Sequence, residues 1–310
     1  MFQNFLVLLH LMKQIVAFLF ALSLIWACDN AEGLRYVSDV LPDDSAQLRI
    51  AVMPTLDCLP IFVADESGFF ENEGIEVSIF PYNAQMDCDT AIERGRVNAV
   101  VSDLVRIENL RQRGLALKEV TSTDLSWQLL SGRQARIKHL KQLDDKMVAM
   151  TRFSATHLLS DKMVDSVKLQ TERVFRIQVN SIPVRMGMME TGIMDAMFLP
   201  EPWASAARNK QAEVLVDTRT MNLRLGVVAF KERAATSRQL TAFCKAYDQA
   251  CDSINERGFQ YYSKLIENRC GVNKETVDSL PDCQFSHTEA PRETDKAVAI
   301  EWLKAKGKLN

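Results

Sequence analysis

One carboxylate and one indole lie close together in a rigid stretch of the sequence, at Glu201 and Trp203. Pro200 and Pro202 flank Glu201, and neither proline has an N–H group to donate to a neighbouring strand. The residue before a proline is disfavoured in the helical region, so Glu201 is expected to be extended. A loop of this kind at the end of a strand predicts the lip of a ligand-binding crevice. A stiff connection in which Trp203 only packs is the alternative that this stretch leaves open.

The strand before this loop belongs to a series of alternating strands and helices. Residues 194–199 have almost no polar face, as expected of a parallel strand that is covered on both sides. The sequence predicts further strands, several of them followed by a helix, at 49–53, 75–79, 97–102, 115–121, 147–150 and 174–179. A strand over 223–230 is expected to return to the first sheet. This α/β alternation predicts right-handed parallel sheets, in two packed domains or one large domain.

Charge and residue spacing argue against several classes of function. The formal net charge is −3 and no basic stripe occurs, so nucleic acid is not expected as a partner. No Cys-x-x-Cys occurs, and His139, His157 and His287 lie nowhere near metal-ligand spacing. We therefore expect neither a metal ion nor another cofactor.

The N-terminal segment, residues 1–27, is expected to be a secretory signal. The apolar run 15–25 is too short to span a bilayer comfortably, and both Met1 and Met12 stay open as the start. The segment ends in I-W-A-C, which resembles a bacterial lipobox, where the cysteine (here Cys28) takes a lipid and becomes the first mature residue. A plain signal with an incidental cysteine is the alternative. Residues 28–48 then form a polar tether.

Six cysteines follow Cys28, and an even number of thiols in an exported protein permits disulfides. Cys270 with Cys283 is the first expected pair, because these residues flank one short helix and its loop. Cys58 with Cys88 is the second. Buried free thiols are the alternative.

Four stretches carry a resemblance to a known family. They are P-I-F-V-A with G-F-F-x-x-x-G-I-x-V in 60–77, G-x-V-x-A leading to S-D in 95–103, G-I-M-D-A leading to L-P-E-P-W-A in 192–204, and A-F-x-x-A-Y-x-x-A in 242–250. In this order they resemble the substrate-binding proteins of ABC transporters for nitrate, sulfonates and taurine. That group also includes binders of thiamine precursors. The resemblance covers nearly all of residues 49–310.

The resemblance implies a periplasmic-binding-protein type II fold, with two α/β lobes and two crossover strands. Lobe one would comprise 49–123 plus 224–310, and lobe two 124–223. The ligand would lie in the cleft between the lobes, in contact with strand-end loops from both. Closure about the crossing strands would then bury it, which is a hinge motion.

The same resemblance indicates which residues would touch the ligand. They are Thr55, Leu56, Asp57, Gln85, Asp87, Ser102, Asp103, Trp127, Arg152, Phe153, Ser154, Thr156, Glu201 and Trp203. The carboxylates would accept hydrogen bonds from N–H groups of the ligand, and the aromatic rings would stack on a flat heterocycle. Arg152 would make a bidentate contact with an anion. At the helix start, Ser154 or Thr156 would cap the helix or leave backbone N–H groups free for an anion. The alternatives are structural: Asp87 complements a helix dipole, Arg152 pairs with Glu201, and Trp127 is core.

Carboxylates outnumber arginines in these loops, which would repel a small bare anion. We therefore expect a ligand with N–H donors and an aromatic face, such as a pyrimidine of the thiamine pathway, ahead of a sulfonate or nitrate-like anion. The protein would deliver it to an ABC permease from the periplasm or cell envelope, anchored to the membrane by lipidated Cys28. Enzymes of a menaquinone route and of pyrimidine synthesis resemble these binders. The sequence shows no Ser–His–Asp set, however, so we do not expect an enzyme. A ligand-sensing module is the other rival.

Overall fold

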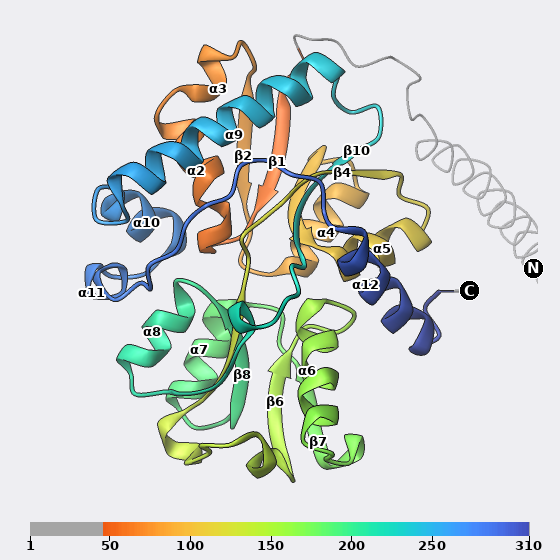
Figure 1. Ribbon diagram of the computed structural model, residues 1–310, viewed down its shortest axis with the longest axis vertical. Helices are drawn as coiled ribbons and strands as arrows, with labels where there is room; N and C mark the ends of the chain where they lie inside the picture. Colours follow the sequence, from red (N-terminus) through yellow and green to blue (C-terminus); the bar gives the residue numbers. More distant parts are fainter. Residues whose placement is uncertain (1–45, 310) are drawn as a thin grey trace, which may run out of the picture. The chain divides into compact units, whose positions relative to one another are not determined.

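The computed structural model describes residues 46–309 of the chain (Figure 1). These residues belong to one compact unit. The expected signal segment 1–27, the lipid site Cys28 and most of the tether lie outside the described residues. Within 46–309, no helix is both long and apolar enough to cross a membrane.

The first sheet has five strands in the order β2-β1-β3-β10-β4, and we use "lobe one" for the part of the structure built on it. Strand β1 (Leu48–Val52) pairs in parallel with β2 (Val77–Pro81) and β3 (Ala99–Asp103). Strand β10 (Gly226–Lys231) runs antiparallel to both β3 and β4 (Leu117–Ser122). All five residues of β3 are buried, as expected of a strand with elements on both faces.

The second sheet repeats this arrangement with the order β7-β6-β8-β5-β9, and it forms the basis of lobe two. Strand β6 (Lys146–Met150) is parallel to β7 (Val174–Gln178) and β8 (Ala196–Pro200). Strand β5 (Trp127–Ser131) is antiparallel to β8 and β9 (Glu213–Asp217). In each sheet the antiparallel inner strand is the one that enters from the other lobe.

Helices connect and cover the strands of both sheets (Figure 1). In lobe one they are α2 (Leu59–Glu66), α3 (Phe69–Asn72), α4 (Gln85–Glu93), α5 (Leu104–Gln112), α9 (Ser237–Arg257), α10 (Ser263–Cys270), α11 (Lys274–Asp278) and α12 (Glu293–Ala305). In lobe two they are α6 (Ala155–Ser166), α7 (Ile182–Glu190) and α8 (Trp203–Asn209). Short 3-10 turns include Leu56–Cys58 after β1.

The chain passes between the sheets twice, at 123–126 and at 218–225. The expectation that the strand near 223–230 returns to the first sheet is confirmed by β10, and the two-lobed α/β fold is confirmed as well. The expectation of purely parallel sheets is wrong, because β10 and β5 each insert antiparallel beside a parallel strand. The residue numbers assigned to the lobe boundaries stay a prediction.

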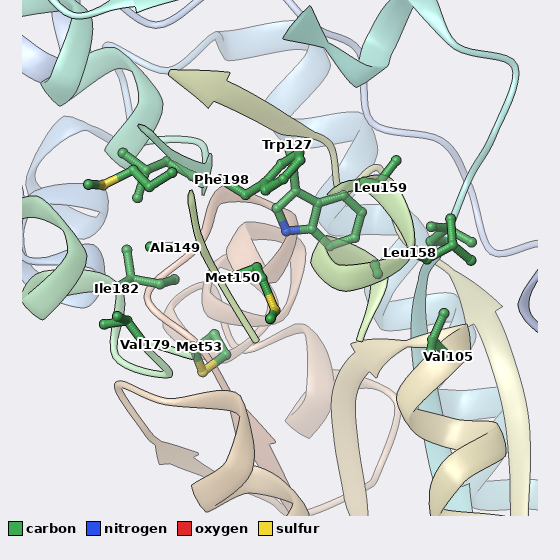
Figure 2. Packing of buried hydrophobic residues seen from close by; sticks show 14 of the residues in the cluster. Met53, Val105, Trp127, Ala149, Met150, Leu158, Leu159, Val179, Ile182 and Phe198 are labelled. Atoms are coloured by element: carbon green, nitrogen blue, oxygen red, sulfur yellow. The ribbon is translucent and has the colours of Figure 1, made fainter. Parts of the chain in front are cut away.

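The strand alternation of β1 divides the core into two clusters. Leu48, Ile50 and Val52 face one cluster, which is built from lobe one residues, whereas Ala51 faces the other. This second cluster is continuous across both lobes. Figure 2 shows part of it, with Met53 of lobe one drawn among Met150, Val179 and Ile182 of lobe two.

The cysteine pairs expected from the sequence are wrong, because Cys58, Cys88, Cys270 and Cys283 are all free thiols. Cys58 lies in the lobe one cluster, whereas Cys88 lies in the cluster that spans both lobes. The first sheet therefore separates these two sulfur atoms. Cys270 is almost fully buried, in keeping with the alternative of buried free thiols.

Candidate functional site

A cavity of about 60 Å³ lies where the strand ends of the two sheets face each other. Its lining residues are Met53, Thr55, Asp57, Gln85, Val101, Ser102, Asp103, Leu125, Trp127, Thr151, Ser154, Thr156, Asn180, Ile182, Arg185 and Pro200. The charged members of this set are Asp57 and Asp103 from lobe one and Arg185 from lobe two. The rest combine hydroxyl and amide groups with apolar side chains and one indole.

Asp57 lies in the 3-10 turn Leu56–Cys58, which follows β1 after a short loop, and only 4% of its surface is exposed. The Thr123 hydroxyl donates to its Oδ2 atom at 3.3 Å, whereas the buried Oδ1 atom has no hydrogen-bond partner among the described residues. Burial is the main cause that raises the pKa of Asp57 to about 6. This carboxylate is therefore incompletely satisfied and offers an acceptor for an N–H or O–H donor.

Asp103 is the last residue of β3 and the N-cap of α5, so the sheet edge and the helix start fix its position together. Its Oδ1 atom accepts from the backbone N–H of Arg106 in lobe one and of Ala155 in lobe two, each at 3.0 Å. Burial raises the pKa of Asp103 to about 7. One carboxylate oxygen thus joins the first turns of two helices in different lobes.

Hydroxyl groups dominate the loop after β6 in lobe two. Ser154 is the N-cap of α6, where its side chain accepts from Thr156 N at 3.2 Å. The Ser154 hydroxyl donates to Thr151 O at 2.7 Å, and the Thr156 hydroxyl accepts from Thr151 N at 2.9 Å. These bonds hold the start of α6 in one conformation at the cavity wall.

Arg185 is the buried cation of lobe two, with 3% of its surface exposed. It lies on α7, which begins after the N-cap Ser181 and has a proline in its first turn. Its guanidinium donates to Val179 O at 2.7 Å, Phe198 O at 2.8 Å and the Thr151 hydroxyl at 2.7 Å. Burial lowers the pKa of Arg185 to about 10, which leaves the side chain charged. All three partners are neutral, so within residues 46–309 no carboxylate bonds to this positive charge.

Loops of the two lobes bond directly to each other around the cavity. Leu56 N donates to Glu201 O, and the Trp203 indole donates to Pro54 O, both at 2.8 Å. On another side, the loops before α4 and α7 meet in an antiparallel bridge between Ala84 and Ser181. An engineered apolar cavity that binds benzene has a volume of about 150 Å³, well above that of this cavity. A ring-shaped ligand would therefore require the lobes to part or the lining side chains to move.

The C-terminal helix also joins the lobes, because α12 packs on α5 of lobe one and contacts α6 of lobe two. The Trp302 indole donates to Asp161 Oδ2 at 2.9 Å, and Lys306 pairs with the same oxygen at 2.6 Å. The ring of His157 meets Trp302 edge-on, with the two ring centroids 4.9 Å apart. His157 thus packs between α6 and α12, and its pKa falls to about 4, chiefly because of burial.

Most residues expected from the sequence to touch a ligand line this cavity. The structure brings together Thr55, Asp57, Gln85, Ser102, Asp103, Trp127, Ser154 and Thr156. Trp127 lines the cavity and also belongs to the core that spans the lobes, as its structural alternative predicted. Contact of any of these residues with a ligand stays a prediction.

The other expected residues lie outside the cavity lining. Leu56 lines a neighbouring cavity of about 40 Å³, and Asp87 and Arg152 are exposed. Phe153 adopts a left-handed backbone with φ of 51°, and the Lys308 ammonium lies 4.4 Å from its ring centroid. Trp203 contributes its indole to the bond between the lobes described above.

Glu201 precedes a cis peptide bond to Pro202, and its carboxylate bonds to groups of the following helix α8. Its carboxylate accepts from Ser205 N and from the Arg208 guanidinium, both at 2.9 Å. The suggested pairing of Arg152 with Glu201 is therefore wrong. The reason is local, because α8 places Arg208 two turns after Glu201, where it reaches the carboxylate first.

Arg185 and Asn180 were missed by the sequence analysis. A lone arginine between apolar helix positions resembles a surface residue, and its burial depends on Phe198 and Thr151, which are distant in sequence. The S-I-P run at 181–183 was the available signal, because a serine cap and an early proline mark a helix start after β7. Such a start places the first turn of α7 at the same sheet edge as the other cleft loops.

The described residues contain no group of three or more His, Cys, Asp or Glu side chains arranged to hold a metal ion. The acceptors, donors and apolar groups of the cavity suit noncovalent recognition of a small molecule. A carboxylate wall opposite a cationic wall also gives the cavity a direction, with acceptors on one side and donors on the other.

The fold is similar to those of solved binding proteins, at low sequence identity. The alkanesulfonate-binding protein SsuA of Xanthomonas axonopodis pv. citri, bound to MOPS, has a TM-score of 0.73 and 17% identity, covering 86% of this chain and 96% of its own. The aliphatic sulphonate binding protein SsuA of Escherichia coli has a TM-score of 0.70 and 15% identity, covering 84% and 92%. The nitrate-binding protein NrtA of Synechocystis PCC 6803 has a TM-score of 0.71 and 11% identity, covering 86% and 83%.

No curated protein matches the chain in sequence. The family model described as NMT1/THI5 like matches residues 55–256, which is more than half of the 310 residues. The match includes both crossings between the sheets and every residue that lines the cavity except Met53. The chain therefore belongs to the NMT1/THI5-like family.

Proposed function

We propose that this protein is an extracytoplasmic solute-binding lipoprotein, which captures a small molecule between its lobes and delivers it to an ABC permease. The family match and the likeness to periplasmic sulfonate- and nitrate-binding proteins support the binding role. In this role the cleft opens, takes up the ligand and closes by hinge motion about the two crossing segments. The protein would then be a carrier rather than an enzyme.

The observation that carries the proposal is the composition of the cavity between the lobes. Its polar groups come from the end of β3, from the segments that follow β1, β6 and β7, and from the first turns of α4, α6 and α7. Loops after parallel strands that converge on one crevice are where α/β proteins bind ligands. Because both lobes contribute, a bound molecule would hold them together and signal its presence through closure.

The charges of the cavity favour a ligand with N–H donors and a flat apolar face. Asp57 and Asp103 lie on the lobe one wall, and the Oδ1 atom of Asp57 lacks a partner among the described residues. The Trp127 ring supplies a surface on which a heterocycle can stack. We propose an aminopyrimidine of the thiamine pathway as the ligand class, ahead of a sulfonate or nitrate-like anion.

Calorimetry of the purified protein tests this choice. Titration with aminopyrimidines of the thiamine pathway is expected to give tight binding, and titration with taurine or an alkanesulfonate is expected to give none. Asp57→Asn should weaken aminopyrimidine binding at least tenfold, because it replaces an acceptor-only group with one that also carries donors. Tight binding of taurine with no binding of aminopyrimidines would overturn the ligand class.

Two further parts of the proposal have separate tests. Labelling with a radioactive fatty acid should mark the wild type and not Cys28→Ala, and an unlabelled wild type would remove the lipid anchor. Co-purification of the ligand-loaded protein with a membrane permease and its ATPase would support transport. A partner that lacks an ATPase would instead favour a sensing module.

A further inference from the structure

The first turn of α6 is the part of the cavity from which a further inference follows. This helix has 12 residues, and Ser154 and Thr156 at its start line the cavity. The first N–H groups of a helix have no partners within it and carry partial positive charge, so they attract anions. The group that accepts hydrogen bonds from these N–H groups decides whether an anion from solution can bind there.

In this protein the occupant is a side chain of the other lobe. Ala155 N donates to Asp103 Oδ1 at 3.0 Å, and Asp103 is 5% exposed. The same oxygen caps α5 through Arg106 N at 3.0 Å, so lobe one holds the carboxylate in place. A second anion at the start of α6 would lie against the Asp103 carboxylate in a poorly solvated site, where repulsion is strong when that carboxylate is ionised.

The remaining groups of lobe two suit an anion. Arg185 lines the same cavity, is nearly fully buried, and donates to two carbonyl oxygens and to the Thr151 hydroxyl. Thr151 in turn bonds to Ser154 and Thr156 at the start of α6. Lobe two thus assembles a buried cation, hydroxyl groups and a helix start, which together favour oxyanions. Lobe one places the Asp103 carboxylate at the start of α6.

We propose that Asp103 is the specificity residue that keeps oxyanions out of the cleft. Its carboxylate takes the position at the start of α6 that a sulfonate, sulfate or nitrate group would otherwise occupy. Ligands that bring N–H donors meet acceptors in lobe one and are accepted, whereas ligands that bring a negative charge are rejected. This inference rests on the proposed binding function and assigns its ligand selectivity to one side chain.

The test is a gain of oxyanion binding after Asp103 is shortened. Asp103→Ser keeps a good N-cap for α5 but is too short to hold the acceptor position at Ala155 N. Calorimetry with methanesulfonate and with sulfate is expected to show at least tenfold tighter binding to Asp103→Ser than to the wild type. Asp103→Asn keeps an acceptor oxygen and loses only the charge, so its gain should be smaller. The control is Asp87→Ser, an exposed carboxylate outside the cavity, which should match the wild type.

Two results would overturn the inference. One is a folded Asp103→Ser, judged by circular dichroism, whose affinity for methanesulfonate equals that of the wild type. The other is a wild type that already binds methanesulfonate as tightly as the variant. If Asp103→Ser does not fold, Asp103→Asn decides, and no gain there is also a refutation. Failure of the proposed function has a different signature, namely a wild type that binds no small molecule, including the aminopyrimidines.

Discussion

The two lobes have the same strand order and opposite chemistry at corresponding edges. Each sheet has three parallel strands, an antiparallel strand from the other lobe and an outer strand. The loop after β1 presents Asp57, and the equivalent loop after β6 presents the hydroxyl groups of Thr151 and Ser154. The second parallel unit of lobe one supplies Gln85 from α4, and that of lobe two supplies Arg185 from α7.

This difference shows that topology determines where a ligand can contact the protein, whereas a few side chains determine what it can be. Lobe one offers acceptors with raised pKa values, and lobe two offers donors and a buried positive charge. A ligand that satisfies both walls would carry donors on one edge and an acceptor on the other. The following predictions break or sharpen this contrast, from the largest expected effect to the smallest.

Loss of the lobe two cation is expected to have the largest effect on stability. Arg185→Met removes the hydrogen bonds that the guanidinium donates to Val179 O, Phe198 O and Thr151 Oγ1 in the interior of lobe two. The free energy of unfolding should fall by about 3 to 4 kcal/mol. Urea unfolding measures this change, with the exposed Arg94→Met as the control. A loss below about 1 kcal/mol would show that these bonds contribute little.

The lobe one carboxylate should reveal itself in the pH dependence of stability. The pKa of Asp57 in the folded protein is about 6, above its ordinary value of 3.8, so the folded state holds this proton more tightly. The stability contributed by the bound proton is fully present below pH 3.8 and is lost as the pH rises through about 6. Relative to Asp57→Asn, the wild type should lose about 2 to 3 kcal/mol from about pH 4 to about pH 7.

Urea unfolding of both proteins at several pH values checks the Asp57 prediction. The Asp57→Asn variant removes this titration and leaves the others, so the difference between the two curves isolates one group. Parallel curves across this range would mean that Asp57 titrates normally in the folded protein. Asp103 would then be the lobe one carboxyl group of the cavity whose pKa is raised.

A smaller effect is expected where α12 bridges the lobes. Trp302→Phe keeps most of the packing against His157 and removes the indole N–H that donates to Asp161 at 2.9 Å. The free energy of unfolding should fall by about 1 kcal/mol, with retention of the fold. Thermal unfolding measures this loss. An unchanged melting temperature would indicate that Lys306 and Arg176 satisfy Asp161 without the indole.

The smallest effect is expected at Asp87, which the sequence placed among the ligand-binding residues. Asp87 is exposed on α4 and does not line the cavity. Asp87→Asn should change the free energy of unfolding by no more than about 0.5 kcal/mol and leave the affinity of the natural ligand unchanged. Calorimetry checks the affinity. A tenfold loss of affinity would place Asp87 in the binding site, which would then extend beyond the lining of the cavity.

Much of this fold was predictable because its signals are local. The apolar run over 97–102 predicts a buried strand, and the acidic residue that follows it can cap a helix. The structure contains both features, as β3 and as the N-cap Asp103. The strands β5 and β9 were not predicted, because W-Q-L-L-S does not alternate and E-V-L-V-D is short and partly exposed. Both strands depend on pairing with residues far away in sequence.

The cavity was predictable in part for the same reason. Asp103 ends a strand, Asp57 and Ser154 lie within five residues of a strand end, and strand ends can be located from apolar runs. Arg185 could not be found in this way, because its partners belong to three separate elements that meet only in the folded chain. Glu201 was expected to face the ligand, but its carboxylate pairs with Arg208 instead. Arg208 lies on α8, a helix that was not predicted from the sequence.

The central claim is that one small molecule is held in the cavity between the lobes, and native mass spectrometry tests it most directly. The comparison is between freshly purified wild type and Ile182→Phe, in which a larger ring fills the cavity from the start of α7. We predict that the wild type retains a small molecule and that Ile182→Phe does not. The same bound mass on both proteins, or none on either after incubation with a small-molecule extract of cells, would contradict the account.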